Sequence, residues 1–589
     1  MPETRWLAIC LAVGLIAVAL VSWLVMRPSA TGPSMHFTIE LPEGATLGSR
    51  GNPLAFSPDG RVFVYCARLN GTTSLFLRML NQPEARLIAG AEDACNPFFS
   101  PDGRWIGYFA ARDSRLRKIA PEGGSPVDLC AAPSGMGACW LPDGKILFSP
   151  DDLSELWSVP AEGGDPQPVT KLENQDLSHR WPEILPGGKT ILFTAGVAGV
   201  ANSHRIVALS LKTGERSIVA EDASFPRYAP AGHLLYLRSG ALFAQPFDAV
   251  RLKLKGTPLR VLRDVKIDQA AGACQLAFSP AGSLVYAPAG QESALRSLVW
   301  EDRQGSVQRA VVSQGVFSHP RLSPDGTRLA VVGYSPDGAS HVWIADLADG
   351  SFTRLAQEGN CTLPLWSPDG KWIALASDRN GRWNLFMLPA DGSAAAVQLH
   401  RSEYPEVPTS WSPDGKHLCL TQFHPDSGPD IWMLAVKEDR VWPFLRQRSG
   451  EWGGVFSPDG RWLAYTSDES GLSQVYVRSV SGAGEARQLS TAEGREPVWS
   501  PDGRQLYYRY WRGVMSAPFR TDPEPTADAP QLILQGQYGD GAIPGFQNYD
   551  ISPDGLRFLL IREEGAADRR LYFVHNWFED LRQISATRR

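Results

Sequence analysis

The stretch REPVWSPDGRQL, residues 495–506, contains the element on which the fold of this chain depends. In its central tetrad, Pro501 presets the φ angle of a type I turn, Asp502 suits the next position, and Gly503 accepts the left-handed conformation that leaves the turn. Apolar and polar residues alternate on both sides of the tetrad, which is typical of strands buried on one face. The stretch therefore predicts a tight β-hairpin.

The same tetrad recurs along the chain at nearly constant spacing. Eight in-register copies read SPDG, and four further in-register copies read LPDG, LPGG, APAG and SPAG; one more SPDG, at Ser335, lies only 12 residues after Ser323 and is interpreted as an extra hairpin within a blade. Most intervals are 41 to 45 residues, which matches the roughly 40–45 residues of a four-stranded propeller blade. One such sheet cannot bury both of its faces, whereas sheets packed around an axis can. The copies begin at Ser57, Ser100, Leu141, Leu185, Ala229, Ser279, Ser323, Ser367, Ser412, Ser457, Ser500 and Ser552.

Two longer intervals divide these twelve units into two sets of six. The intervals after Ala229 and Ser500 exceed 45 residues, and the segments responsible, 242–262 and 514–534, resemble each other. Because four to eight blades are usual for one ring, we predict an all-β fold of two consecutive six-bladed β-propellers behind a single N-terminal transmembrane helix. A single twelve-unit array is the alternative. The predicted parts are a cytoplasmic tail at 1–5, a membrane anchor at 6–26, a linker at 27–35, propellers at 36–303 and 304–580, and a C-terminal tail at 581–589.

Each ring is expected to close with a strand from its other end. HFTIEL at His36 and VQRAVV at Val307 precede the first and seventh tetrads by similar distances, so each is predicted to supply the outer strand of its ring's sixth blade. Residues 570–575 are predicted to form the third strand of the last blade. The tail after them is predicted to cover the rim of that ring or, alternatively, to dock a partner, with one apolar helical face made of Trp577, Phe578, Leu581 and Ile584.

The N-terminal region contains 21 residues without a charge, WLAICLAVGLIAVALVSWLVM at 6–26, between Arg5 and Arg27. That length spans a bilayer as a helix, and it exceeds the apolar core of about 7–15 residues found in a cleaved signal peptide. We therefore expect an uncleaved anchor, with cleavage as the alternative. Only five residues precede the run, so we expect the propellers on the extracytoplasmic, periplasmic side of the cell membrane.

Composition argues against nucleic acid and against a zinc or redox centre. Lys and Arg number 57 against 63 Asp and Glu, and the net charge of -6 is spread without long runs, whereas phosphate binding needs a concentrated basic stripe. Seven cysteines follow the apolar run, and none is part of a CxxC motif. Cys130 and Cys139 flank one short loop and are the only pair considered for a disulfide.

Several phrases outside the tetrads carry a resemblance to a known family. They include FTIELPEG at Phe37, NPFFSPDGRWIGYFA at Asn96, SHRWPEILPGGKTILFT at Ser178 and LVWEDRQG at Leu298. With the repeat, they resemble the TolB-like, WD-repeat-like β-propeller family over nearly the whole exported region. They also look like the extracytoplasmic half of bacterial receptor-type serine/threonine kinases, in which a kinase domain precedes a membrane helix and propellers follow. The resemblance implies this architecture and does not identify a ligand.

Motifs of catalysis are not found in the sequence. The five residues before the apolar run leave no room for the glycine-rich loop, catalytic lysine or HRD loop of a kinase, and no serine has the GxSxG surroundings of an α/β-hydrolase. The ten histidines are scattered singly, so neither a metal site nor a cofactor is expected. We expect a non-enzymatic, membrane-anchored binding, sensing or scaffolding module for a protein, peptide or cell-envelope component. The alternatives are the sensory half of a split receptor with a separate kinase, and a hydrolase or lyase active in a propeller channel.

Candidate ligand-binding residues lie in the loops that lead into the innermost strands, on the face opposite the tetrad turns. Polar side chains there are predicted to line a mouth that binds an anionic or peptide ligand. The alternative is that they form ordinary hydrogen bonds and ion pairs between blades. The candidates are Asn96, His179, Arg180, Arg227, His319, Arg321, Glu406, Arg495, Glu496 and Asn548.

Overall fold

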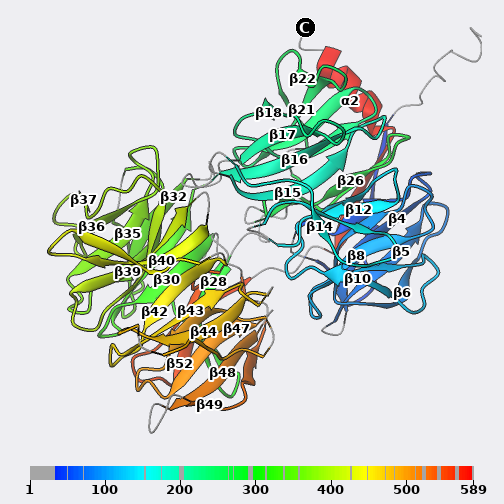
Figure 1. Ribbon diagram of the computed structural model, residues 1–589. Coiled ribbons are helices and arrows are strands. Elements are labelled where there is room, and N and C mark those ends of the chain that lie inside the picture. The colour runs from blue at the N-terminus through cyan, green and yellow to red at the C-terminus, as the bar shows by residue number, and fades with distance from the viewer. Residues whose placement is uncertain are drawn as a thin grey trace, which may run out of the picture.

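The regular secondary structure of the described chain is almost entirely β-sheet, and its one described helix, α2 (Trp577–Ala586), lies at the C-terminal end (Figure 1). This confirms the all-β prediction. The computed structural model describes residues 34–48, 51–69, 72–151, 154–173, 176–197, 204–262, 264–268, 271–289, 296–311, 315–335, 339–355, 358–424, 427–447, 449–470, 472–482, 484–491, 493–510, 513–520, 526–536, 538–539, 545–563 and 569–586.

The predicted tail at 1–5 and the predicted anchor at 6–26 lie outside these residues. Within the ranges given above, we find no helix with the length and apolar character needed to cross a membrane.

The tetrads form the predicted hairpin turns, as the copy at Ser500 illustrates. The Ser500 hydroxyl donates a hydrogen bond of 2.6 Å to Asp502 Oδ1, and the Gly503 amide donates one of 2.9 Å to the Ser500 carbonyl. The same carboxylate accepts from the Arg504 amide, and the Ser500 hydroxyl accepts from the Gln505 amide. Gly503 has φ of +70°, as the turn requires. Serine and aspartate thus satisfy the backbone of a bend that Pro and Gly shape.

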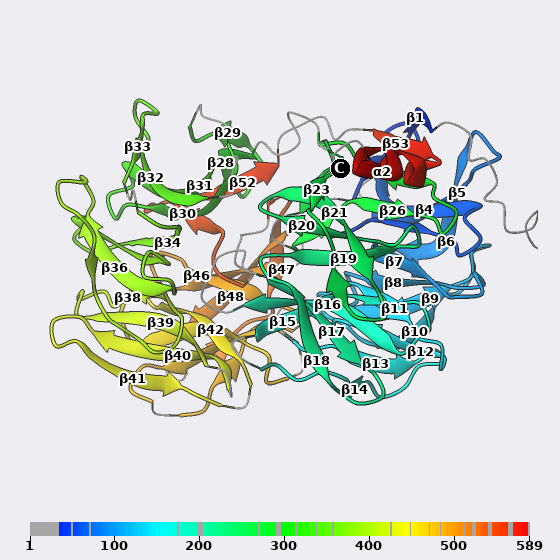
Figure 2. The same cartoon turned by 90° about the horizontal axis from the view of Figure 1, so that it is seen from above.

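The sheets fall into two sets (Figures 1 and 2). The first set comprises six sheets of four or five strands and one short ribbon among the described residues. In chain order these are β2 (Thr46–Leu47), β3 (Leu54–Phe56), β4 (Val62–Leu69), β5 (Thr72–Met79) and β6 (Ala85–Glu92); β7 (Ala94–Phe99), β8 (Ile106–Ala110), β9 (Arg115–Ile119) and β10 (Val127–Ala131); β11 (Ala138–Trp140), β12 (Lys145–Phe148), β13 (Trp157–Pro160) and β14 (Gln167–Pro168); β15 (Asp176–Ile184), β16 (Thr190–Val197), β17 (His204–Ser210) and β18 (Arg216–Ala220); β19 (Ser224–Ala229), β20 (His233–Arg238), β21 (Ala241–Asp248), β22 (Lys253–Leu254) and β23 (Leu259–Arg260); the ribbon β24 (Ile267–Asp268) and β25 (Ala273–Cys274); and a sheet of β26 (Leu276–Phe278), β27 (Leu284–Tyr286), β53 (Arg570–His575) and β1 (Met35–Glu40).

The second set comprises six further sheets in the described part of the chain. They are β30 (Phe317–Leu322), β31 (Arg328–Tyr334), β32 (Ser340–Asp346) and β33 (Phe352–Arg354); β34 (Cys361–Trp366), β35 (Trp372–Ser377), β36 (Asn384–Pro389) and β37 (Val397–Gln398); β38 (Glu406–Trp411), β39 (His417–His424), β40 (Gly428–Ala435) and β41 (Arg440–Leu445); β42 (Glu451–Phe456), β43 (Trp462–Ser467), β44 (Gln474–Ser479) and β45 (Arg487–Gln488); β46 (Arg495–Trp499), β47 (Gln505–Tyr510), β48 (Gly513–Arg520), β49 (Thr526–Ala527) and β50 (Gln531–Gln535); and β51 (Tyr549–Ile551), β52 (Arg557–Glu563), β28 (Arg296–Asp302) and β29 (Val307–Arg309).

The tetrads of neighbouring sheets pack against one another on one face of each set, which we call the turn face. The opposite face, where loops lead into the innermost strands, is the loop face. In the second set each tetrad glycine lies against the proline of the preceding tetrad: a Cβ atom added at Gly370 would lie 3.7 Å from Pro324. This series of contacts returns to its start, because a Cβ atom added at Gly326 of the first tetrad would lie 2.9 Å from Pro553 of the last tetrad. The tetrad is therefore both a turn and a contact between sheets.

Closure of the first set differs from the prediction. Strand β53 (Arg570–His575) pairs with β1 and with β27, so it belongs to the first set and not to the last sheet of the second. The third strand of that last sheet is instead β28 (Arg296–Asp302), which pairs with β52 and β29. The prediction for residues 570–575 is therefore wrong, and strands cross the expected boundary at 303/304 in both directions. The predicted outer positions of β1 and β29 are confirmed.

Helix α2 covers the first set, and not the rim of the second as predicted. The Trp577 amide donates a 2.8 Å hydrogen bond to the carbonyl of the tetrad residue Gly282, and Phe278 packs on Trp577 and Phe578. Trp577 and Leu581 are buried, but Ile584 is 39% exposed. The helix follows β53 to the turn face because strand and helix are joined by Asn576 alone.

All seven cysteines of the described chain are free thiols. Cys130 lies on β10 and Cys139 on β11, in neighbouring sheets whose packing keeps these side chains in separate surroundings, so the disulfide considered for this pair is not formed.

We expect a chain ending at Arg569, which lacks β53 and α2, to lose the closed first set while the second set stays folded. The open sheet of β26 and β27 then has no third strand, whereas every strand of the second set is retained. Limited proteolysis with mass spectrometry should show rapid cleavage within 36–286 and protection of 296–563.

A chain ending at Asn576 is the matched control, because it keeps β53 and loses only the buried Trp577 and Leu581 of α2. We expect it to be destabilised by about 3–5 kcal/mol without selective opening of 36–286. Equal protection of both segments in the shorter chain would contradict the closure assigned to β53.

Candidate functional site

The loops of the loop face end in a recurring bulge in which a residue with positive φ precedes a proline. His319 (φ 50°) precedes Pro320, and Glu496 (φ 59°) precedes Pro497. The ladder skips at this point, for example between Ser318 and Arg321. The bulge turns the residue before proline toward the centre of its set. Asn96, Trp181, Phe225 and Leu363 have the same conformation.

In the first set, the centre of the loop face is filled by Trp181. Its side chain is 1% exposed, and its indole Nε1 donates a 2.7 Å hydrogen bond to the Ala271 carbonyl. A Cβ atom added at Gly137 would lie 2.6 Å from Trp181, and one added at Gly51 would lie 2.9 Å from it. These glycines come from different sheets, so the indole packs where several innermost strands converge. The predicted candidate Asn96 is buried beside it, and its side-chain amide bonds to the Asn52 amide and the Gly135 carbonyl.

In the second set, apolar side chains fill the same place. Trp452 and Phe546 are buried in one cluster with residues from three further sheets or loops, and a Cβ atom added at Gly545 would lie 2.2 Å from the Trp452 indole. The cluster leaves polar candidates at its margin only. Its other buried members are Leu363, Ala376, Trp383 and Val407.

Four predicted candidates meet where the first, fifth and last sheets of the second set adjoin. The His319 amide donates a 2.7 Å hydrogen bond to Asn548 Oδ1, and the Asn548 amide donates one of 3.0 Å to Glu496 Oε2. Arg321 donates to the Tyr549 carbonyl at 3.0 Å and to Gln547 Oε1 at 2.9 Å. Burial lowers the pKa of His319 to about 3, so its imidazole stays neutral. These residues form a buried network of hydrogen bonds that joins the sheets.

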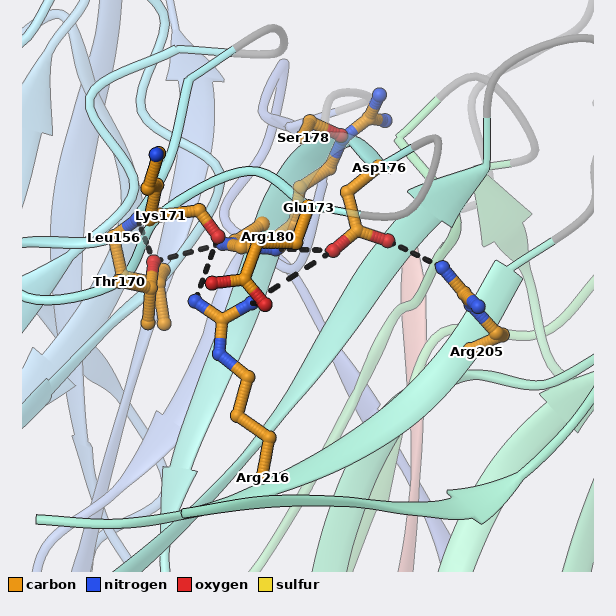
Figure 3. A network of polar contacts seen from close by, with 10 residues as sticks. Leu156, Thr170, Lys171, Glu173, Asp176, Ser178, Arg180, Arg205 and Arg216 are labelled. Carbon is orange, nitrogen blue, oxygen red and sulfur yellow. Dashed lines mark hydrogen bonds and ion pairs between the residues drawn. The ribbon is translucent and has the colours of Figure 1, made fainter. Parts of the chain in front are cut away.

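His179 belongs to a polar chain that links two sheets of the first set (Figure 3). The Leu156 amide donates to the Thr170 hydroxyl at 2.8 Å, Thr170 lies 2.7 Å from His179 Nδ1, and His179 Nε2 lies 3.0 Å from Asp176 Oδ2. Threonine, histidine and aspartate in this order resemble a nucleophile relay. However, Thr170 and His179 are buried, and the threonine oxygen is already used by a backbone amide. The chain therefore holds β13 against β15.

Two arginines surround the carboxylate at the end of this chain. Arg205 Nη2 lies 2.5 Å from Asp176 Oδ1, and Arg216 bonds to the Lys171 carbonyl at 2.6 Å (Figure 3). Burial alone raises the pKa of Asp176, but the hydrogen bond with His179 and the Arg205 charge bring it below its ordinary value. The candidate Arg180 points elsewhere and donates to the Ser178 hydroxyl at 2.8 Å.

The remaining arginine candidates also form ion pairs. Arg227 lies 3.3 Å from Glu183 of the preceding sheet and stacks over the Phe225 ring. Arg495 pairs with Glu493 two residues earlier. Arg227 and Arg495 thus lie at separate places between strands of the described chain, and a ligand-binding role for the ten candidates stays a prediction.

Glu406 differs from the other candidates. It is fully buried on β38, and both of its carboxylate oxygens are without a hydrogen-bond partner. Burial raises its pKa to about 8, against smaller opposing effects of the nearby Gln422 side chain and Leu385 backbone. Glu451, 45 residues later in the next sheet, is also buried; its Oε1 accepts a 2.6 Å hydrogen bond from the Ser449 hydroxyl, its Oε2 has no partner, and burial raises its pKa to about 7. In the folded protein, burial therefore favours the protonated form of Glu406 and of Glu451.

The sequence reasoning missed the residues that fill the two centres and the second buried acid. The proline three residues before six of the twelve tetrads was the available signal for the bulge, and the 45-residue spacing was the signal for Glu451. Nothing local indicated that Trp181 and Trp452, rather than polar groups, occupy the centres. Within the described ranges, no group of three or more His, Cys, Asp or Glu residues is arranged to hold a metal ion.

A family model provides the identification. The TolB beta propeller domain matches residues 277–406 and 398–574, which together span just over half of the chain. The chain belongs to the TolB β-propeller family. The predicted family is confirmed.

Curated relatives of this family match parts of the chain. The Tol-Pal system protein TolB of Anaeromyxobacter dehalogenans is 33% identical over 129 residues, which are 21% of this chain and 29% of that protein. The uncharacterized peptidase YuxL of Bacillus subtilis is 29% identical over 208 residues, 34% of this chain and 30% of that protein. The chain thus spans less than a third of the length of these relatives.

A solved structure of TolB from Acinetobacter baumannii, 16% identical, covers 67% of this chain and 81% of its own with a TM-score of 0.33. The resemblance to receptor-type kinases is not tested by any of these matches and stays a prediction.

Replacing Glu406 by glutamine should stabilise the protein increasingly as the pH rises. A carboxyl whose pKa is raised by folding contributes stability below its unfolded pKa of about 4.3 and loses it as the pH rises through about 8. We expect the unfolding free energy of Glu406→Gln, relative to the parent, to rise by about 1–3 kcal/mol between pH 5 and pH 8. Denaturant titrations at both pH values measure this.

Glu403→Gln is the matched control, because Glu403 is exposed three residues earlier. A pH-independent difference between Glu406→Gln and the parent would show that Glu406 is ionised in the folded protein.

Asp176→Asn should destabilise the first set, because Arg205 and His179 lose a buried anionic partner. We expect a loss of about 3 kcal/mol at pH 7, with the difference from the parent shrinking below pH 4, where the parent carboxylate also becomes protonated. Asp165→Asn, at an exposed position nearby, should change stability by less than about 0.5 kcal/mol. If both variants melt alike, the network in Figure 3 contributes no stability.

Proposed function

We propose that this protein is a membrane-anchored, extracytoplasmic binding module, without catalytic activity of its own, that presents two six-bladed β-propellers to a protein, peptide or cell-envelope component. The propellers are supports, and recognition takes place on their surface loops. A protein partner in general fits the TolB β-propeller family to which the chain belongs.

The count of six blades in each propeller is supported by the closed series of turns. In the second set the glycines of six successive tetrads each pack on the proline of the tetrad before, and the last returns to the first. In the first set, β26 lies against β3, and a Cβ atom added at Gly60 would lie 3.0 Å from Ser279. The two propellers exchange strands, so we place β28 with 304–563 and β53 with 35–286.

The observation that carries the non-catalytic role is the filled centre of each propeller. A channel enzyme needs polar groups that converge on an accessible cavity. Here Trp181 fills one centre and the cluster around Trp452 fills the other. Most polar candidates instead bond between neighbouring sheets. Such rings are rigid, and a rigid support for loops suits recognition.

The relatives bear on this choice without deciding it. TolB is described by name as a protein of the Tol-Pal system, and YuxL as a peptidase. We favour the binding role because the filled centres argue against hydrolysis within a propeller.

The proposed membrane anchor is supported by the sequence alone. The 21 uncharged residues at 6–26 are long enough to span a bilayer, and everything after them would then lie on one side. The intact protein should remain in the membrane fraction after a carbonate wash. A chain lacking residues 1–26, exported with a cleavable signal, should appear in the soluble periplasmic fraction. Recovery of the intact protein in the soluble fraction would contradict the anchor.

The binding role is tested by crosslinking in intact cells, followed by affinity purification from membranes. We expect a defined partner to be recovered with the intact protein and not with an equally tagged, unrelated single-span protein. Recovery of the same proteins with both baits, or of none, would count against the role as a binding module.

A further inference from the structure

Both ends of the described chain leave the first propeller on its turn face. β1 begins at Met35, which pairs with His575 at the end of β53. One residue further on, the Trp577 amide bonds to the carbonyl of the tetrad residue Gly282. Figure 2 shows α2 beside β1 and β53, and His36 lies 3.2 Å from Asp580 of the helix. The segment that precedes β1 therefore arrives at the turn face.

The second propeller is attached on the opposite side. β27 starts directly after the tetrad at Ser279 and ends at Tyr286, which pairs with Tyr572 near the start of β53. Both connections to the second propeller thus begin on the loop face. Burial raises the pKa of Tyr510 in the second propeller, and the charge of Arg112, on the loop face of the first, opposes this rise. The turn face of the first propeller points away from the second.

A basic hairpin with an apolar tip extends from this turn face. It comprises residues 248–256, DAVRLKLKG, between β21 and the end of β22. Val250 at its tip is 93% exposed, and Arg251 and Lys253 beside it are exposed too. Its position on the turn face follows from the pairing of His233, the residue after a tetrad, with Pro246. Figure 1 shows β22 next to α2.

The rest of the face adds apolar groups at its rim. Met35 is 56% exposed at the start of β1, and Leu80 is 39% exposed in the turn after β5. Ile584 on α2 is exposed to the same degree. Of these groups only Val250 is flanked by Arg and Lys, and this is the composition of segments that lie in the interface of an anionic bilayer.

The internal repeat provides a contrast. The second propeller has the corresponding longer segment, and there the residues read RTDPEPTAD at 520–528, with three acids and one base, against one acid and three bases at 248–256. The fold therefore does not require a basic hairpin at this position. The positive charge is particular to the propeller nearer the predicted anchor.

The length of the intervening chain is consistent with a position near the bilayer. Eight residues, 27–34, separate the predicted span from β1. At no more than about 3.6 Å per residue they reach at most about 29 Å, so the start of β1 lies no farther than that from the end of the predicted span.

We propose that the turn face of the first propeller lies on the anionic lipid surface, with the 248–256 hairpin and α2 against the headgroups and the second propeller held away from the membrane. This inference rests on the proposed anchor. The lipid surface is favoured over a protein partner by the basic charge of the hairpin and by the arrival of the chain at this face.

The test uses the intact chain in vesicles of phosphatidylethanolamine and phosphatidylglycerol that contain a headgroup-level spin-labelled lipid. An NBD fluorophore is attached at Val250→Cys or, as the matched control, at Leu556→Cys, which is 66% exposed on the turn face of the second propeller. The parent chain, treated identically, reports background labelling of the native thiols. We expect the probe at 250 to lose at least about half of its fluorescence, since interfacial residues lie within about 5–10 Å of the headgroups, and the probe at 556 to be unaffected.

Reversing the charge of the hairpin tests whether its basic residues hold it against the anionic lipid. Arg251→Glu with Lys253→Glu, in the Val250→Cys background, should restore most of the fluorescence, as should vesicles of phosphatidylcholine alone. Vesicle flotation separates the two hypotheses. Protein that does not float with the vesicles contradicts the anchor, whereas protein that floats with an unquenched probe at 250 overturns the orientation and leaves the anchor intact. Protection of the probe that depends on protein concentration and not on lipid would assign the face to a second copy of the chain and overturn the proposal.

Discussion

The pairing of β53 with β1 and β27 is the constraint on which the rest of the architecture depends. It brings residues at opposite ends of the chain into one sheet, so the first propeller cannot close until the second has been made. Both connections to the second propeller must then start where β27 ends and β53 begins, on the loop face. One register of six residue pairs thereby sets which face is turned toward the second propeller and which remains free.

The tetrad turns show how one local element serves two levels of structure. Within a sheet, serine and aspartate satisfy the backbone of the bend, which removes the cost of leaving polar groups unpaired. Between sheets, the left-handed glycine presents a surface without a Cβ atom to the proline of the neighbouring turn. The same residues therefore determine the hairpin and the spacing of adjacent sheets, and this double role explains why the spacing is so regular.

The buried polar groups follow from the same geometry. Innermost strands converge at the axis, where little water has access, so each polar side chain there needs a partner in a neighbouring sheet. His319, Asn548 and Glu496 satisfy one another by hydrogen bonds between sheets, and His179 is satisfied by Thr170 and Asp176. The polar groups near the axis are thereby occupied by contacts between sheets, whereas charge and exposure on the surfaces differ between the two sets.

Sequence by itself determined the hairpins and the recurring turn tetrads, because turn chemistry and strand alternation are local properties that a short segment carries. It also predicted the outer positions of β1 and β29. Only the tertiary structure decided that β28 pairs within the second set and β53 within the first. Both are short strands with alternating apolar residues, so neither segment by itself indicates the strand with which it pairs. The same holds for candidates such as His319 and Arg321: the sequence shows their residue types, but their hydrogen-bond partners Asn548 and Tyr549 lie more than 200 residues away in the chain.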